Sequence, residues 1–119
     1  MISIVTKWWH VDGARDKAVA ALKDLVRQVE QHEPDTYMYC LHTSVVPGSL
    51  PPPTPNELIF MGAWKDMKAF EAHRDGKLFQ DWLAEHLDLF VKNSGHLYVS
   101  AEFADRFAGF VRKEAVGQK

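Results

Sequence analysis

The sequence has little cysteine, no long apolar run and no excess of charge of either sign. Cys40 is the single cysteine among 119 residues, so the chain cannot form an intramolecular disulfide, which agrees with a reducing compartment. No stretch approaches the roughly 18 consecutive apolar residues of a membrane-spanning helix. Lys7 and Asp12 interrupt the apolar N-terminus before the core of a signal peptide would be complete. We therefore expect a cytoplasmic protein with no membrane partner.

The charged side chains are nearly balanced in number and are scattered along the chain. There are 14 Lys and Arg residues against 16 Asp and Glu residues, which gives a net charge of −2. No basic stripe alternates with aromatic residues, so a nucleic-acid partner is not expected. A length of 119 residues, with 46% hydrophobic and 25% charged residues, is typical of one soluble globular domain. We expect a single domain over residues 1–119, with a core over 1–102 and an extension over 103–119.

Apolar residues recur with strand-like and helix-like periods along the chain. We expect Asp12 to cap the first helix and Pro34 to end it, because proline disfavours helical geometry in the residue before it. Asp66 is expected to cap a second helical region, which Gly76 interrupts. The expected elements are a strand at 2–10, a helix at 13–32, strands at 36–43 and 57–65, helices from 66 to about 92, a strand at 96–102 and an amphipathic tail with helical spacing at 103–115.

Residues 46–56 hold five of the six prolines. Such a segment cannot be helical and makes a poor strand. We expect a stiff connector between two strands, with a lid over a pocket or a partner contact as the alternative. Cys40, in the strand before this segment, is expected to be a small buried hydrophobic side chain.

The expected order β-α-β-β-α-β is that of the ferredoxin-like fold, an α+β arrangement in which helices cover one face of an antiparallel four-stranded sheet. Three of the strands carry apolar side chains on both faces. In strand 2–10, Ile4 and Trp8 share one face while Val5 and Trp9 share the other. The face away from the helices would then expose a large apolar patch, which is unusual for a soluble protein. We therefore expect a symmetric homodimer that buries this sheet face.

Residues 35–90 carry a motif that combines an aromatic strand, a strand ending in Trp and a helix bearing His. Its parts are Asp35-Thr-Tyr-Met-Tyr-Cys-Leu-His42, Gly62-Ala-Trp64, Ala69-Phe-Glu-Ala-His73 and Phe79. In these residues the chain resembles the antibiotic biosynthesis monooxygenase domain, a family with the dimeric α/β-barrel fold. That family often has Glu two residues before the Trp, where this sequence has Gly62.

The resemblance implies a cofactor-independent monooxygenase that acts on a small aromatic substrate of quinol or anthrone type. Such a substrate reacts with oxygen once it is deprotonated, so the protein must supply a dry aromatic pocket, a base and donors that hold the anion. His73 is the expected catalytic base, because imidazole titrates near neutrality. The expected substrate-binding residues are Trp64, Phe79 and Trp82, which offer stacking surfaces, and Tyr39, His42 and His96, which can hold the substrate oxygen.

Other interpretations of the same residues stay open. The aromatic candidates and His73 are equally compatible with core packing, and the protein is alternatively a non-catalytic dimeric module that binds a ligand or has a structural role. Haem degradation is a further alternative, because the resemblance implies an axial His, a Trp and an Asn for that reaction. Trp64 and His73 supply two of these, but the first strand has no Asn. No other cofactor is expected, and no side-chain metal site, since the six histidines form no His-x-His or His-x-x-x-His pair.

Overall fold

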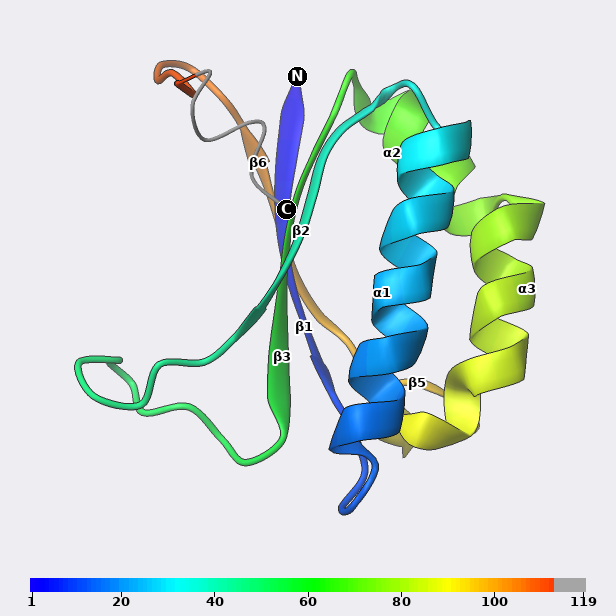
Figure 1. Ribbon diagram of the computed structural model, residues 1–119. Coiled ribbons are helices and arrows are strands. Elements are labelled where there is room, and N and C mark those ends of the chain that lie inside the picture. The colour runs from blue at the N-terminus through cyan, green and yellow to red at the C-terminus, as the bar shows by residue number, and fades with distance from the viewer. Residues whose placement is uncertain (113–119) are drawn as a thin grey trace.

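The computed structural model describes residues 1–112, and it places helices on one side of a four-stranded sheet (Figure 1). The helices are α1 (Arg15–His32), α2 (Met67–Asp75) and α3 (Lys77–His86), with a short 3₁₀ turn, η1 (Leu87–Leu89), after them. The strands are β1 (Ile2–Trp9), β2 (Thr36–Thr43), β3 (Glu57–Trp64), β4 (Lys92–Asn93), β5 (His96–Leu97) and β6 (Ser100–Asp105).

The sheet has the strand order β2-β3-β1-β6, and every neighbouring pair is antiparallel. This order, with the helices on one face, is the ferredoxin-like arrangement, so the expected fold class is confirmed. The two short strands β4 and β5 pair only with each other. None of the helices in the described part of the chain is long and apolar enough to cross a membrane.

Side chains on β1 alternate between the two faces of the sheet. Ile4 and Trp8 are buried beneath the helices, whereas Val5 on the opposite face is 40% exposed. The buried stripe of α1 packs onto the same covered face and consists of Ala18, Ala21, Leu22, Leu25 and Val29. The core therefore lies between the sheet and the helices, as the helical period of α1 predicts.

The two expected helix caps have different outcomes. Asp66 caps α2 as expected, because its carboxylate accepts a hydrogen bond from the Ala69 backbone N–H at 2.8 Å. Asp12 does not cap α1, which begins at Arg15 without a side-chain cap. Gly13 adopts a φ of +79°, which turns the chain before the helix starts. The Asp12 carboxylate instead accepts a hydrogen bond from Asn56 Nδ2 at 2.7 Å.

The second helical region ends earlier than the expected residue 92. Helix α3 stops at His86, and η1 then delivers Phe90 into the core, where it is fully buried. The backbone of Val91 donates to the Trp9 carbonyl at 2.8 Å, next to the bridge between Phe90 and His10. Burial of Phe90 and pairing with the end of β1 thus replace the last helical turns.

The expected last strand, 96–102, is divided in two. His96 and Leu97 pair with β4, while the sheet strand β6 starts at Ser100 and continues to Asp105. The sheet therefore uses residues 103–105, which helical spacing had assigned to the tail. Residues 106–112 form no helix, and 113–115 lie outside the described residues. Phe107 is 99% exposed and Phe110 is 76% exposed, so these two side chains lack the packing that would induce a helix.

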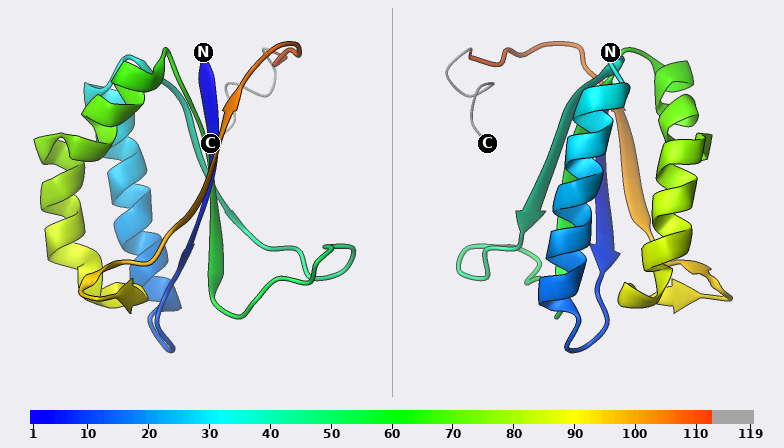
Figure 2. Two further views of the ribbon diagram at one scale, coloured as in Figure 1. Left: turned by 180° about the vertical axis from the view of Figure 1, so that it is seen from behind. Right: turned by 45° about the vertical axis from the view of Figure 1, so that its right-hand side comes forward.

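The proline-rich segment is neither helix nor strand, as expected, and it extends from the side of the sheet opposite the helices (Figure 2). Glu57 at the start of β3 fixes the first end by accepting a hydrogen bond from Ser44 Oγ at 2.7 Å. The other end is held by Trp9 Nε1, which donates to Thr54 Oγ1 at 2.7 Å. Burial opposes the charge of Glu57, but hydrogen bonds from Ser44 and Lys7 keep the pKa of Glu57 below its usual value.

Cys40 is exposed, contrary to the expected buried position. Its register partner on β3 is Met61, which is 39% exposed on the face that no helix covers. Alternation along β2 places Cys40 on that face, because Tyr39 and Leu41 point toward the helices.

Candidate functional site

A cavity of about 480 Å³ lies between the helix-covered face of the sheet and the helices α2 and α3. Segment 96–103 forms a further wall. The residues that line the cavity are mostly apolar, and they are Ile4, Thr6, Trp8, Tyr39, Phe60, Gly62, Trp64, Phe70, His73, Arg74, Phe79, Gln80, Leu83, His96, Leu97, Val99, Ala101 and Phe103. An apolar hollow of this size with a few polar groups is the usual form of a small-molecule site.

His73 is a buried histidine on α2, and its ring makes a hydrogen-bond contact with Glu33 at the end of α1. Its Nδ1 lies 2.6 Å from Glu33 Oε1, and the same oxygen accepts a hydrogen bond from Thr36 Oγ1 at 3.1 Å. Pro34 ends α1, so Glu33 sits where α1 meets α2. An ionised carboxylate makes Nδ1 the donor, which leaves Nε2 as the ring nitrogen that can accept a proton.

Aromatic rings surround His73 on the cavity wall. The centroid of its ring lies 5.4 Å from Trp64, 5.4 Å from Phe79 and 5.2 Å from Tyr39. Phe70 packs edge-on against Trp64 at 5.0 Å. These rings come from β2, β3, α2 and α3, and together they provide flat apolar surfaces beside one titratable group.

Tyr39 adds a hydroxyl group to the same wall. Burial of its ring, and next the negative charge of Glu33, raise the pKa of Tyr39 well above its ordinary value. The phenol therefore stays protonated across the neutral range and can act as a hydrogen-bond donor. A donor of this kind can hold an oxygen anion that forms in the cavity.

Five of the seven predicted site residues line the cavity, and two do not. The five are Tyr39, Trp64, His73, Phe79 and His96. Trp82 is instead a core residue whose Nε1 donates to the Ala21 carbonyl at 2.9 Å. His42 pairs with Ile59 on the opposite face of the sheet and is exposed there, because it is one residue out of phase with Leu41.

Sequence reasoning missed several residues of the site. The most important of these is Glu33, which contacts His73. It was missed because it lies 40 positions from His73 along the chain and no local pattern joins the two. Arg74 and Gln80 also line the cavity. Helical spacing could have suggested both, because Arg74 lies four residues after Phe70 on α2 and Gln80 lies three residues before Leu83 on α3. Val99 and Ala101 lie in the expected last strand but were not proposed as site residues, and Phe103 lies beyond the expected end of that strand.

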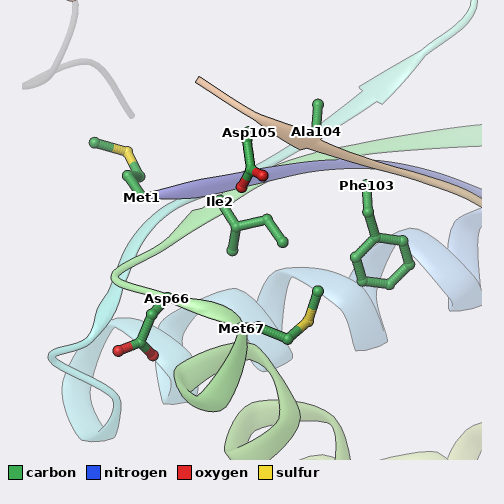
Figure 3. Close-up of a pocket in the computed structure, with 7 residues that line it drawn as sticks. All are labelled: Met1, Ile2, Asp66, Met67, Phe103, Ala104 and Asp105. Carbon is green, nitrogen blue, oxygen red and sulfur yellow. The ribbon is translucent and has the colours of Figure 1, made fainter. Parts of the chain in front are cut away.

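A second hollow of about 380 Å³ lies at the edge of the sheet, near the N-terminus (Figure 3). Its lining residues are Met1, Ile2, Asp66, Met67, Phe103, Ala104 and Asp105. Figure 3 shows Ile2 and Phe103 pointing toward α2, where Met67 lies. The Asp66 carboxylate is occupied as the cap of α2, and no histidine lines this hollow. The larger cavity is therefore the better candidate for chemistry.

The side chains that commonly bind metal ions are not grouped into a site in the described part of the chain. Within residues 1–112, no group of three or more His, Cys, Asp and Glu side chains is placed to hold a metal ion. The Glu33–His73 pair supplies only two such groups, and hydrogen bonding already joins them.

The comparisons with known proteins give a family from one source and a fold from another. The model of the antibiotic biosynthesis monooxygenase family matches residues 1–85. A candidate antibiotic biosynthesis monooxygenase from Caulobacter crescentus is similar in structure with a TM-score of 0.74 and 16% identity, over 90% of this chain and 90% of that one. Its counterpart from Nitrosomonas europaea has a TM-score of 0.70 and 13% identity, over 91% of this chain and 100% of that one. At these identities the likeness shows the fold alone, and a comparison with curated proteins gives no match.

Proposed function

Because the chain belongs to the antibiotic biosynthesis monooxygenase family, we propose that it is a cofactor-independent monooxygenase acting on a small aromatic substrate of quinol or anthrone type. A fold of this kind does not fix a reaction, so the proposal rests on the site. The observation that carries it is the contact between His73 and Glu33, 2.6 Å long, on the wall of an aromatic cavity of about 480 Å³.

The proposed reaction begins with proton transfer. The substrate ring stacks against Trp64 and Phe79, and Nε2 of His73 takes the proton that ionises the substrate. Glu33 stabilises the imidazolium that forms, as a carboxylate does beside a catalytic histidine. The Tyr39 hydroxyl, and His96 at the cavity wall, hold the substrate oxygen while it carries negative charge.

The ionised substrate then supplies the electrons for oxygen. In an anthrone, the ring CH₂ becomes a carbonyl, one oxygen atom enters the product and the other leaves as water. The two substrate hydrogens and the electrons of the two C–H bonds balance this step, so no external reductant is required. The protein contributes the base, the donors and the apolar cavity walls that hold the substrate beside them.

Two other functions use the same cavity. A non-catalytic ligand-binding module needs the aromatic walls but not the His73–Glu33 pair, so the pair favours catalysis. Haem degradation would use Trp64 and His73 together with an Asn, and none of the cavity-lining residues is Asn. The lining residues therefore do not fit the haem site that the family resemblance implies.

We also propose that the protein is one cytoplasmic domain that forms a homodimer through the sheet face opposite the helices. Val5 and Met61 are 40% and 39% exposed on that face, and Cys40 lies beside them. Apolar side chains gathered on an uncovered sheet face favour burial against a second copy. The single cysteine supports the reducing compartment.

The function is tested by measuring oxygen consumption with a panel of quinols and anthrones. Wild type should consume oxygen with at least one of them, and His73→Ala should lose about 10²- to 10⁴-fold in rate while it stays folded. Ligand binding is followed in parallel by the shift in melting temperature. A shift in melting temperature without oxygen consumption would indicate a binding module. If no compound gives either response, both functions are excluded for this substrate class.

The dimer is tested with a matched pair of substitutions measured by light scattering after size-exclusion chromatography. Met61→Asp places a charge in the proposed interface and should give monomers. Met67→Asp is the control, because Met67 is 41% exposed on α2, away from that face. Equal behaviour of the two variants would contradict an interface on the uncovered face.

A further inference from the structure

Gly62 and Trp64 lie two residues apart on β3, and both face the helices. The indole of Trp64 folds back along the strand and covers Gly62. A Cβ atom at position 62 would lie 2.3 Å from Trp64 Cη2 and 2.4 Å from Cζ3, distances that real Cβ atoms do not show. Because Gly62 is not among the positive-φ residues of the described chain, the requirement for glycine here is one of space.

Neighbouring rings limit where the indole can move. Tyr39 and Phe70 pack edge-on against it at 6.1 Å and 5.0 Å, and His73 lies at 5.4 Å. The Trp64 Nε1 is buried and has no hydrogen-bond partner among the described residues. Packing alone therefore holds the ring. The space that remains open beside it is the cavity, so a side chain at position 62 must displace the indole into that cavity.

We propose that Gly62 and Trp64 together determine the size of the substrate. Because residue 62 has no side chain, the Trp64 indole lies flat against β3. The cavity is then long enough for a fused, planar substrate with several rings. This inference rests on the proposed function, and it narrows the substrate class to the anthrone type. Trp64, His73 and Phe79 line the cavity in succession, with neighbouring centroids 5.4 Å apart and neighbouring planes tilted by 41°. A planar substrate therefore stacks on one of these rings and extends along the cavity, whose volume of about 480 Å³ leaves room for fused rings.

The experiment compares Gly62→Ala, Trp64→Phe and the double variant. Binding of a single-ring quinol and of a three-ring anthrone is measured by isothermal titration calorimetry under nitrogen, and oxygen consumption is measured separately. Gly62→Ala should weaken anthrone binding about tenfold or more and quinol binding by far less. Trp64→Phe in the Gly62→Ala background should restore anthrone binding, because phenylalanine lacks the part of the indole that Cβ would strike.

If Gly62→Ala does not fold, the single variant Trp64→Phe still tests the proposal. This substitution lengthens the cavity, so the ratio of anthrone affinity to quinol affinity should stay the same or increase. Equal losses for both ligands in Gly62→Ala, or no rescue in the double variant, would overturn the size rule. If wild type binds the anthrone but consumes no oxygen, the oxygenase function fails while the size rule is still decided by binding. If wild type binds neither ligand, both proposals fail.

Discussion

Trp82 on α3 and Trp64 on β3 are two of the three buried tryptophans, and their surroundings differ. Trp82 packs in the core against Trp8 and Phe90, and its N–H donates a hydrogen bond to the Ala21 carbonyl. Trp64 is equally buried, but its N–H has no partner in the described chain and its ring borders a cavity. Residue type and burial are therefore the same for the two tryptophans, while their hydrogen bonding and the space beside them differ.

The difference follows from what packs around each ring. Leu25 and Val29 of α1 belong to the same buried cluster as Trp82, and both are almost fully buried. Trp64 borders the cavity, whose lining reaches the edge strand β6. That strand is exposed along its whole length, and Ala101 offers too little side chain to fill the space. Similar residues therefore form a core in one place and border a cavity in another.

The largest effect is expected from substitutions that compare the two tryptophans directly. Trp82→Phe removes a buried hydrogen bond and leaves a void, which should cost about 2 kcal/mol or more in the free energy of unfolding. Trp64→Phe removes no hydrogen bond and should cost about half as much. Urea titration measures both. Equal losses in the free energy of unfolding would mean that the surroundings of Trp64 are packed as tightly as those of Trp82.

A second prediction concerns Glu33, the carboxylate that contacts His73 on the cavity wall. Glu33→Gln should lower the rate of oxygen consumption about tenfold, equivalent to about 1.4 kcal/mol, because it removes the charge that stabilises an imidazolium. The loss should appear in kcat with KM nearly unchanged, because Glu33 contacts His73 and not the substrate. A purely structural role for Glu33 would instead lower the melting temperature and leave kcat of the folded fraction unchanged.

The control for this prediction is Glu71→Gln. Glu71 is exposed and lies on α2 close in sequence to His73, so it loses the same charge without touching the pair. Its kcat should match that of wild type. A loss of similar size in both variants would show that the net charge of the protein, rather than the 2.6 Å contact, determines the rate.

Local patterns predicted most of the fold. Periodic apolar residues gave the strands and α1, and Asp66 and Gly76 gave the start and the break of the second helical region. The errors occur where long-range pairing competes with local preference. Phe90 leaves helical geometry to enter the core, and the phenylalanine spacing after residue 103 resembles a helix although β6 pairs with β1 up to Asp105.

The site was only partly predictable, because a cavity is defined by what is missing between elements. Trp64, His73 and Phe79 could be proposed from one continuous stretch and the family resemblance. Trp82 could not be excluded, since its distance from the cavity depends on the position of α1. Glu33 could not be included, since only the tertiary structure brings the end of α1 to α2.

The smallest effect is expected at Tyr39, whose hydroxyl serves the cavity in our proposal. The pKa of Tyr39 in the folded protein is raised by burial and then by Glu33, while an unfolded tyrosine has a pKa of about 10. The folded state therefore holds this proton more tightly, and its contribution to stability is complete below about pH 10 and is lost as the pH rises further. Urea titrations at neutral and alkaline pH should show a smaller loss of stability at alkaline pH for Tyr39→Phe than for wild type.

The control Tyr37→Phe changes a ring that is 53% exposed and retains Tyr39, so it should lose stability at alkaline pH as wild type does. Identical pH dependence in all three proteins would place Tyr39 in contact with water, and the cavity end would then be solvated rather than dry.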